Sequence, residues 1–126
     1  MEWILLVGAS FNIIGGVALA LPLFVTPPSW ITAVPPVGGI CPRDYPLYRL
    51  FAVGTAFSFG ALYGYLYMHP EFVVPFLYFG MFLKYWAFLS SLFAVRRYNV
   101  PMDAFIGFGC ANGCVALLFT AYVVFR

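Results

Sequence analysis

Residues 72–95 read FVVPFLYFGMFLKYWAFLSSLFAV, an apolar stretch in which Lys84 is the one charged residue. About 20 apolar residues in a helix rise ~30 Å, which is the thickness of the hydrocarbon core of a bilayer. The stretch therefore predicts a transmembrane helix with Lys84 near the bilayer midplane. A lysine at that depth costs roughly 2.5–3.5 kcal/mol to insert, so we expect it to face the bundle interior and to have polar partners.

The composition of the whole chain indicates the same class of protein. Of 126 residues, 64% are hydrophobic and 8% are charged, and the mean hydropathy is +0.98. Soluble domains have about 25% charged residues, so we predict an integral membrane protein. Long, uniformly apolar runs favour an all-α fold over a barrel, whose strands alternate over segments of about 10 residues. The net charge of +2 is too small to indicate a nucleic-acid partner.

Four apolar runs predict a four-helix antiparallel bundle that forms a single transmembrane domain over residues 1–126. The first run is longer than a signal-peptide core and follows Glu2 and not a basic residue, so we expect it to be retained. The six prolines of residues 26–46 cannot continue a helix, and apolar and aromatic residues among them indicate a loop on the membrane surface. The short turn 69–71 predicts a hairpin of the second and third helices. The predicted helices are residues 3–25, 47–68, 72–95 and 101–125.

The distribution of arginines predicts the orientation of the bundle. The side that holds the first and third connections has four arginines, whereas Arg126 is the one basic residue of the opposite side. Short loops rich in Lys and Arg stay in the cytoplasm. We therefore expect a bacterial inner-membrane protein with both termini on the non-cytoplasmic side. The four arginines are Arg43, Arg49, Arg96 and Arg97.

Three further polar residues fall at the predicted depth of Lys84, namely Asn12, Ser58 and Asn112. The amide oxygens of Asn12 and Asn112 are the expected acceptors for its ammonium group. Glu71 precedes Lys84 by thirteen residues, a rise of about 20 Å that a lysine side chain cannot bridge. This polar layer permits three interpretations: hydrogen bonds between helices, each worth about 0.6 kcal/mol, a ligand or proton site on Lys84, or a contact with another subunit.

Small residues recur at four-residue spacing on two of the predicted helices. Ala56, Gly60 and Gly64 form one such seam, and Gly109 and Gly113 form a second. Small residues at this spacing let two helices approach closely in a membrane. We therefore expect both seams to be helix-packing surfaces.

Few residues indicate reaction chemistry. Cys110 and Cys114 lie one helical turn apart and could share a soft metal such as Cu(I), but without a second pair of ligands we expect small apolar side chains and no metal. The chain has no nucleophile triad, phosphate loop or zinc motif. Because only His69, Lys84 and the three cysteines could move a proton or act as a nucleophile, we predict a protein that is not an enzyme and has no cofactor.

The order of these features resembles that of small four-helix bacterial membrane proteins of the DoxX-like kind, over nearly the whole chain. The resemblance implies the same membrane-embedded bundle. Relatives often have an acidic residue at the position of Asn112, so the resemblance does not transfer an ion pair to Lys84 here. The group has no general biochemical activity to transfer, and fold alone does not imply function. The matching segments are NIIGG at 12–16, LYRLFAVGTAFSFGALYGY at 47–65, HPE at 69–71 and GMFLKYWAF at 80–88.

Two functional hypotheses follow from these observations. The leading one is a structural or accessory subunit that packs against other integral membrane subunits or a second copy of itself, with membrane lipids around it. The two seams, the surface loop, and the 15 Phe, 9 Tyr and 3 Trp offer more contact surface than a lone bundle needs. The alternative is a binder or carrier of a small lipid-like or quinone-like molecule, with Lys84 as its polar anchor inside the membrane.

Overall fold

The computed structural model describes residues 2–24 and 45–126, and all regular structure within them is helical. Four helical segments are long and apolar enough to cross a membrane: Trp3–Leu21, Leu47–Met68, Pro70–Tyr98 and Met102–Phe125. The prediction of an all-α chain with four apolar helices is therefore confirmed. The elements in order are α1 (Trp3–Phe24), α2 (Tyr45–Met68), the 3₁₀ turn η1 (Pro70–Phe72), α3 (Val73–Tyr98), α4 (Met102–Ala104), the π-helical segment η2 (Phe105–Cys110) and α5 (Ala111–Phe125).

The helix ends follow local residue chemistry. α2 begins at Tyr45, two residues before the predicted start, because a proline such as Pro46 is tolerated in the first turn of a helix. Residues 26–44 of the predicted surface loop lie outside the described residues. α3 continues past residue 95 to Tyr98 and ends at Asn99, which has a left-handed φ of 53°. Asparagine is one of the few residues that adopt this conformation readily at a helix C-terminus.

The fourth predicted helix is not a regular α-helix. Residues 101–125 contain α4, η2 and α5 in succession. The middle element is a π-helix, in which each backbone N–H bonds five residues back, so the segment holds one more residue than an α-helix would. The predicted helix of residues 101–125 is present as the helical segment Met102–Phe125, and the π-helical part within it was not predicted.

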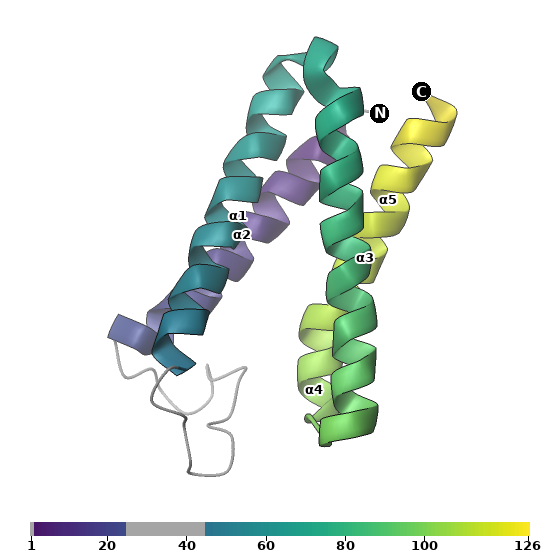
Figure 1. The fold of residues 1–126 in the computed structure, drawn as a ribbon. Helices are drawn as coiled ribbons and strands as arrows, with labels where there is room; N and C mark the ends of the chain where they lie inside the picture. Colours follow the sequence, from purple (N-terminus) through teal and green to yellow (C-terminus); the bar gives the residue numbers. More distant parts are fainter. Residues whose placement is uncertain (1, 25–44) are drawn as a thin grey trace.

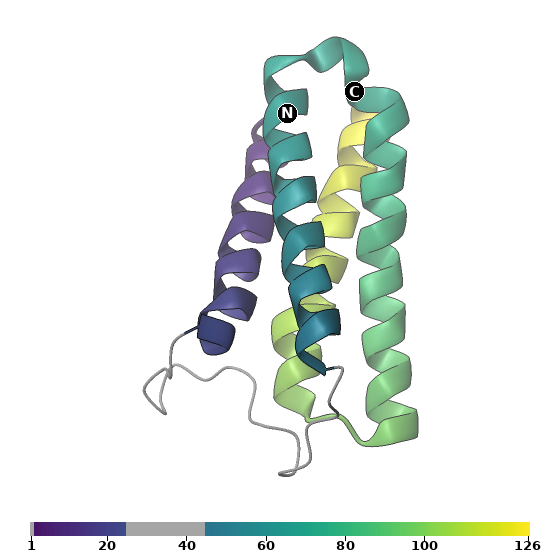
Figure 2. The same cartoon turned by 60° about the vertical axis from the view of Figure 1, so that its left-hand side comes forward.

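The helices form two pairs, seen in both ribbon views (Figures 1 and 2). α1 packs most extensively against α2, and α3 packs against η2 and α5. The turn η1 joins α2 to α3 at the end of the molecule where both chain ends lie. From there α2 and α3 diverge, so these consecutive helices, joined by the predicted short turn, make few contacts with each other.

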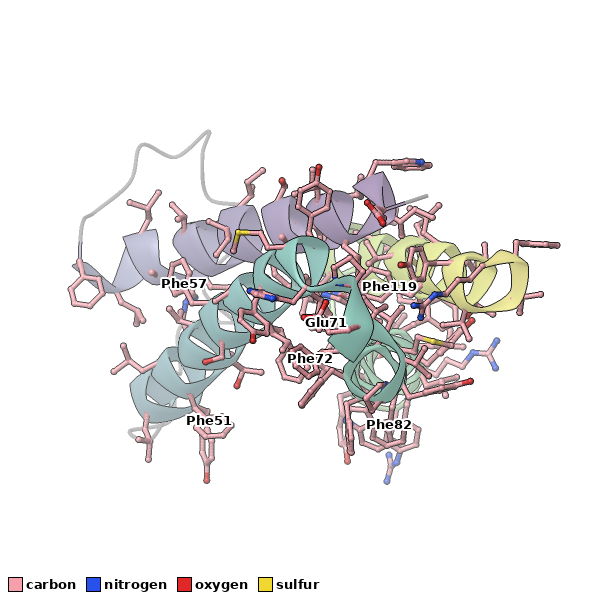
Figure 3. All side chains as sticks on the ribbon, turned by 90° about the horizontal axis from the view of Figure 1, so that it is seen from above. Phe51, Phe57, Glu71, Phe72, Phe82 and Phe119 are labelled. Atoms are coloured by element: carbon pink, nitrogen blue, oxygen red, sulfur yellow. The ribbon has the colours of Figure 1, made fainter. Side chains whose placement is uncertain are left out.

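The apolar core lies in the half of the molecule next to η1. At its centre the Tyr63 and Phe119 rings meet edge to face, with centroids 4.8 Å apart. The Phe119 ring lies so close to Gly8 of α1 that a side chain on Gly8 would overlap it. Figure 3 shows Phe119 within the bundle and Phe82 pointing away from it. The core residues are Ile4, Leu5, Tyr63, Leu66, Val73, Leu77, Val115, Phe119 and Tyr122.

Candidate functional site

Lys84 is the buried charge at the junction of the two helix pairs. Its side chain is 3% exposed, and Asn12 and Asn112 are each 5% exposed. The Lys84 ammonium donates one hydrogen bond to Asn112 Oδ1 on α5, with Nζ and Oδ1 2.9 Å apart, and another to Asn12 Oδ1 on α1. The structure thus brings together three of the four residues that the sequence places in one polar layer, and each comes from a different helix.

An aromatic ring also lies close to the ammonium. Lys84 Nζ lies 4.9 Å from the centroid of the Phe11 ring, an arrangement in which the ring face attracts a cation. Within residues 2–24 and 45–126 the only ion pair joins His69 and Glu71, at 3.3 Å. Amide oxygens and a ring face therefore surround the charge, and no described carboxylate pairs with it.

Asn112 owes its orientation to the π-helical segment directly before it. Its Nδ2 donates to the Phe108 backbone oxygen at 2.8 Å, which leaves Oδ1 to accept from Lys84. A π-helical turn disturbs the regular i→i−4 pattern, so a side-chain amide is well placed to bond a carbonyl there. Gly109 allows this segment to lie close to α3, because a Cβ on it would come within 2.8 Å of Ser91 Cβ. The closely spaced glycines 107, 109 and 113 were the available sequence signal for this irregularity.

Ser58 does not belong to the polar cluster. It is exposed and lines a shallow hollow on the surface of α2 with Phe51 and Thr55. Its neighbour Gly60 faces α1, where a Cβ would lie 2.7 Å from Ile13 Cδ1. Two residues correspond to about 200° around a helix, so Ser58 points away from that contact. The number of residues along α2 predicts the depth of Ser58 but not the side of the helix to which its side chain points.

Sequence reasoning overlooked Tyr63, which reaches the same region from α2. Its side chain is fully buried, and its hydroxyl has no hydrogen-bond partner among the described residues. The hydroxyl lies against Gly80 of α3, where a Cβ would be 2.5 Å away. Since Gly80 is one helical turn before Lys84, the phenol and the ammonium approach the same face of α3.

Most small residues of the two predicted seams pack against other helices of the same chain. On α2, Gly60 is the close contact with α1, whereas Gly64 has no atom within 4 Å of its Cβ position, and Ala56 is half-buried. On the other pair, Gly109 faces Ser91, and a Cβ on Gly113 would come within 3.0 Å of the Phe88 ring. Three of the five predicted packing residues are therefore contacts within a helix pair: Gly60 between α2 and α1, and Gly109 and Gly113 between the last helix and α3.

The two cysteines of the last helix do not gather further metal ligands. Cys110 is half-buried, and Cys114 is exposed. Within the described parts of the chain, no three His, Cys, Asp or Glu residues lie close enough to hold a metal ion together. Cys110 and Cys114 thus offer a metal ion at most two soft ligands.

No protein-family model, curated protein or solved structure matches this chain. The function must therefore be argued from its own residues. Chemically, the Lys84 cluster is already occupied, because two amide oxygens and a ring face lie against the ammonium. The two asparagines accept from two of the three ammonium donors, so a ligand that left both asparagines in place would have one donor of Lys84 to bind.

Proposed function

We propose that this protein is a non-catalytic subunit of a membrane assembly, packing against other integral membrane proteins or a second copy of itself. The observation that supports it best is the outward face of α3. Large side chains follow a seven-residue repeat along the whole helix, with exposed fractions between 42% and 71%. We call this set the aromatic stripe: Phe72, the last residue of η1, and Phe79, Phe82, Trp86, Leu89 and Phe93 of α3.

A seven-residue repeat is a helix-packing pattern. Side chains repeating every 3.5 residues stay along one seam when two helices cross at a shallow left-handed angle, which is the commonest crossing in transmembrane bundles. The stripe lies opposite the buried face of α3, which contains Leu77, Gly80 and Lys84. It is therefore free to meet a helix from outside the chain.

The outward face of α1 has no such aromatic repeat. It is exposed to a similar degree, but it consists mainly of aliphatic side chains. Aliphatic residues suffice against lipid tails, so the aromatic repeat on α3 favours a protein partner. The exposed aliphatic residues of this face are Leu6, Val7, Ile14, Val17 and Leu21.

The Lys84 cluster has a supporting role in this proposal. The hydrogen bonds of Lys84 to Asn12 and Asn112 fix the depth at which α1, α3 and α5 meet. A fixed register keeps the aromatic stripe straight and continuous for a partner.

The proposed setting is an antiparallel four-helix transmembrane bundle in a bacterial inner membrane, akin to the DoxX-like proteins. Support comes from Arg49, Arg96 and Arg97 at one end of the helices and Arg126 at the other. We expect alkaline phosphatase fused after Arg126 to be active and a green fluorescent protein fused there to be dark. The reverse result would refute this orientation.

The subunit proposal is tested by native mass spectrometry after purification from native membranes in a mild detergent. We expect wild type in a complex of defined stoichiometry, and the variant Phe79→Leu/Trp86→Leu/Phe93→Leu as a folded, partner-free chain. A matched control, Ile14→Leu/Val17→Leu/Leu21→Ile, makes conservative apolar changes on the outward face of α1 and should keep the complex. A monomeric wild type, or a stripe variant that retains its partner, would contradict the proposal.

A second candidate is a binder of a small lipid-like or quinone-like molecule anchored at Lys84. The unpartnered hydroxyl of Tyr63 favours it, because a ligand oxygen there would satisfy a buried donor one turn from Lys84. In that case a small molecule should accompany the partner-free wild type and be lost from Lys84→Met. Solvent extracts of wild type that contain only bulk lipid would rule this candidate out.

A further inference from the structure

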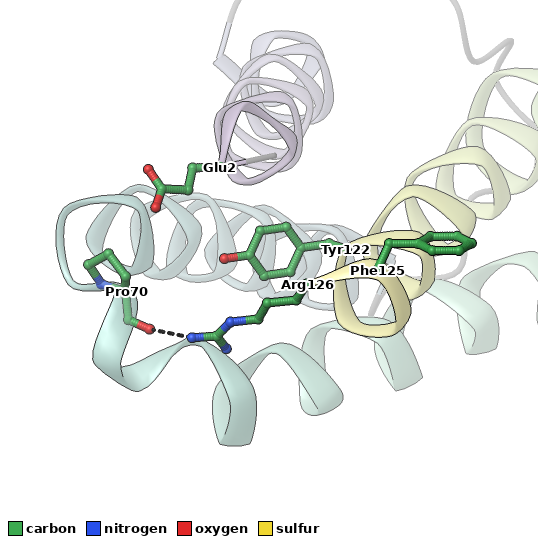
Figure 4. A pocket seen from close by; sticks show the side chains of 5 residues that line it. All are labelled: Glu2, Pro70, Tyr122, Phe125 and Arg126. Carbon is green, nitrogen blue, oxygen red and sulfur yellow. Dashed lines mark hydrogen bonds between the residues drawn. The ribbon is translucent and has the colours of Figure 1, made fainter.

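A second polar site lies at the η1 end of the molecule, away from the Lys84 cluster. It is a pocket of about 310 Å³ lined by Glu2, Pro70, Tyr122, Phe125 and Arg126. Three separate segments form it: the start of α1, the turn before α3 and the end of α5 (Figure 4). Its volume is at the lower limit of known ligand pockets, roughly 300–1,000 Å³, so it suits a small polar group.

Two opposite charges line this pocket without neutralising each other. Among the described residues, neither the Glu2 carboxylate nor the Arg126 guanidinium takes part in an ion pair. Figure 4 shows the Tyr122 ring between them. The wall of the pocket thus presents an anion and a cation on either side of an aromatic ring.

Arg126 is held in place while most of its donors remain available. Its Nη2 donates to the Pro70 backbone oxygen at 3.4 Å, and its Cζ lies 6.0 Å from the centroid of the Tyr122 ring. A guanidinium has five N–H donors in a planar fork. The remaining donors can bind a phosphate through two parallel hydrogen bonds, the geometry that arginine favours.

We propose that this pocket binds a zwitterionic phosphoethanolamine group, with its phosphate on Arg126 and its ammonium on Glu2. A simple anion would be attracted by Arg126 but repelled by Glu2. A simple cation would be attracted by Glu2 but repelled by Arg126. A group that carries both charges can interact favourably with both residues. The two sources of this chemistry are the headgroup of phosphatidylethanolamine and the soluble ester O-phosphoethanolamine.

The position of the pocket suits a lipid headgroup. Pro70 begins one of the membrane-length helical segments and Phe125 ends another, so the pocket lies where headgroups would be if these helices cross a bilayer. Phe125 is highly exposed beside Arg126. Its ring can cover the glycerol end of a lipid while the two charges hold the headgroup.

The test uses the delipidated full chain in a non-ionic detergent, titrated with short-chain phosphatidylethanolamine and phosphatidylglycerol and followed by native mass spectrometry. We expect wild type to prefer phosphatidylethanolamine roughly tenfold, the usual effect of one charge-assisted hydrogen bond. Glu2→Gln should lose this preference, because phosphatidylglycerol has the phosphate but no ammonium. Arg126→Gln should weaken binding of both lipids, again roughly tenfold.

Matched variants separate the pocket from general charge effects. Glu71→Gln removes a carboxylate near the same end that does not line the pocket, and Arg97→Gln removes an arginine at the opposite end. Both should bind as wild type does. Because all four substituted residues are exposed, circular dichroism should show unchanged helix content.

The two sources are distinguished by competition with O-phosphoethanolamine and with inorganic phosphate. Displacement of the lipid by O-phosphoethanolamine at equal concentration supports the soluble ester as ligand, whereas displacement only at a large excess supports the lipid. Equal affinity of wild type for both lipids, a preference that survives Glu2→Gln, or displacement by inorganic phosphate as effective as by O-phosphoethanolamine would overturn the proposal. None of these results depends on whether the chain has a protein partner.

Discussion

The two helix pairs are held together by different means. α1 and α2 meet mainly through shape: Gly60 accommodates Ile13, and a Cβ on Gly16 would lie 3.2 Å from the Phe57 ring. One hydrogen bond also joins this pair, from Arg49 Nε on α2 to the Leu19 backbone oxygen on α1, with the two atoms 2.8 Å apart. α3 and α5 meet through polar bonds as well. Tyr85 Oη and Thr120 Oγ1 are 2.7 Å apart, in addition to the bond between Lys84 and Asn112.

This difference illustrates two ways in which the helices of an apolar chain can associate within lipid. The hydrophobic effect does not draw helices together within lipid, so close packing and hydrogen bonds must do so. The first pair relies mainly on close packing, with one hydrogen bond from a side chain to the backbone, and the second adds hydrogen bonds between side chains. Lys84 then joins the two pairs through Asn12. Substitutions that damage shape should loosen the first pair, and those that damage polar bonds should loosen the second.

The largest effect is expected from Asn112→Leu. The change leaves the Lys84 charge with one amide acceptor and should lower the free energy of unfolding by about 1.5–3 kcal/mol, the range for a hydrogen bond to a charged group. The measurement is reversible unfolding in mixed micelles, followed by circular dichroism. Thr120→Val is the control on the same helix, because it removes a neutral bond worth about 0.6 kcal/mol.

The same unfolding measurement can show whether the Lys84 charge causes the loss of stability in Asn112→Leu. In the double variant Lys84→Met/Asn112→Leu the charge is gone, so the protein should be more stable than Asn112→Leu alone. If the two substitutions instead add in the unfolding free energy, Lys84 and Asn112 are not energetically coupled.

The second-largest effect is expected at the contact between α1 and α2. Gly60→Val places methyl groups against Ile13 and should cost about 1–3 kcal/mol of unfolding free energy. Gly64→Val makes the same change one turn further along α2, where no atom lies within 4 Å of the Cβ position, and should cost about 0.5 kcal/mol or less. Equal losses in the two variants would show that α1 and α2 do not pack through Gly60.

The sequence predicted well what depends on position along a helix axis. Each residue advances a helix by about 1.5 Å, so counting residues was enough to place Asn12 and Asn112 at the level of Lys84. The long apolar runs likewise predicted four membrane-length helices. These are local properties that need no knowledge of neighbouring helices.

Features that depend on rotation and helix pairing could not be predicted in this way. Ser58 has the right depth but the wrong side of α2. Tyr63 was overlooked because its burial against Gly80 exists only once α2 and α3 are placed. The short turn predicts that α2 and α3 are consecutive neighbours but not how closely they pack, and the more extensive contacts are those of α2 with α1 and of α3 with η2 and α5.

The smallest effect is expected from removing one residue of the π-helical segment Phe105–Cys110. Gly107 is exposed, and no atom lies within 4 Å of its Cβ position. Its deletion should convert the segment to a regular α-helix while Asn112 and Phe119 keep facing Lys84 and the core, because a π-helical segment contains one inserted residue. We therefore expect the variant to fold with an unfolding free energy close to that of wild type.

The control for this prediction is the deletion of Leu117 from the regular helix α5. That deletion rotates the following residues by about 100°, which turns Phe119 and Tyr122 out of the core and should abolish cooperative unfolding. Both deletions shorten the same helix by one exposed residue, so only the local helix type distinguishes them. If deletion of Gly107 is as damaging as deletion of Leu117, the π-helical turn is itself needed to hold α3 against the last helix, and the contact of Gly109 with Ser91 becomes the next one to test.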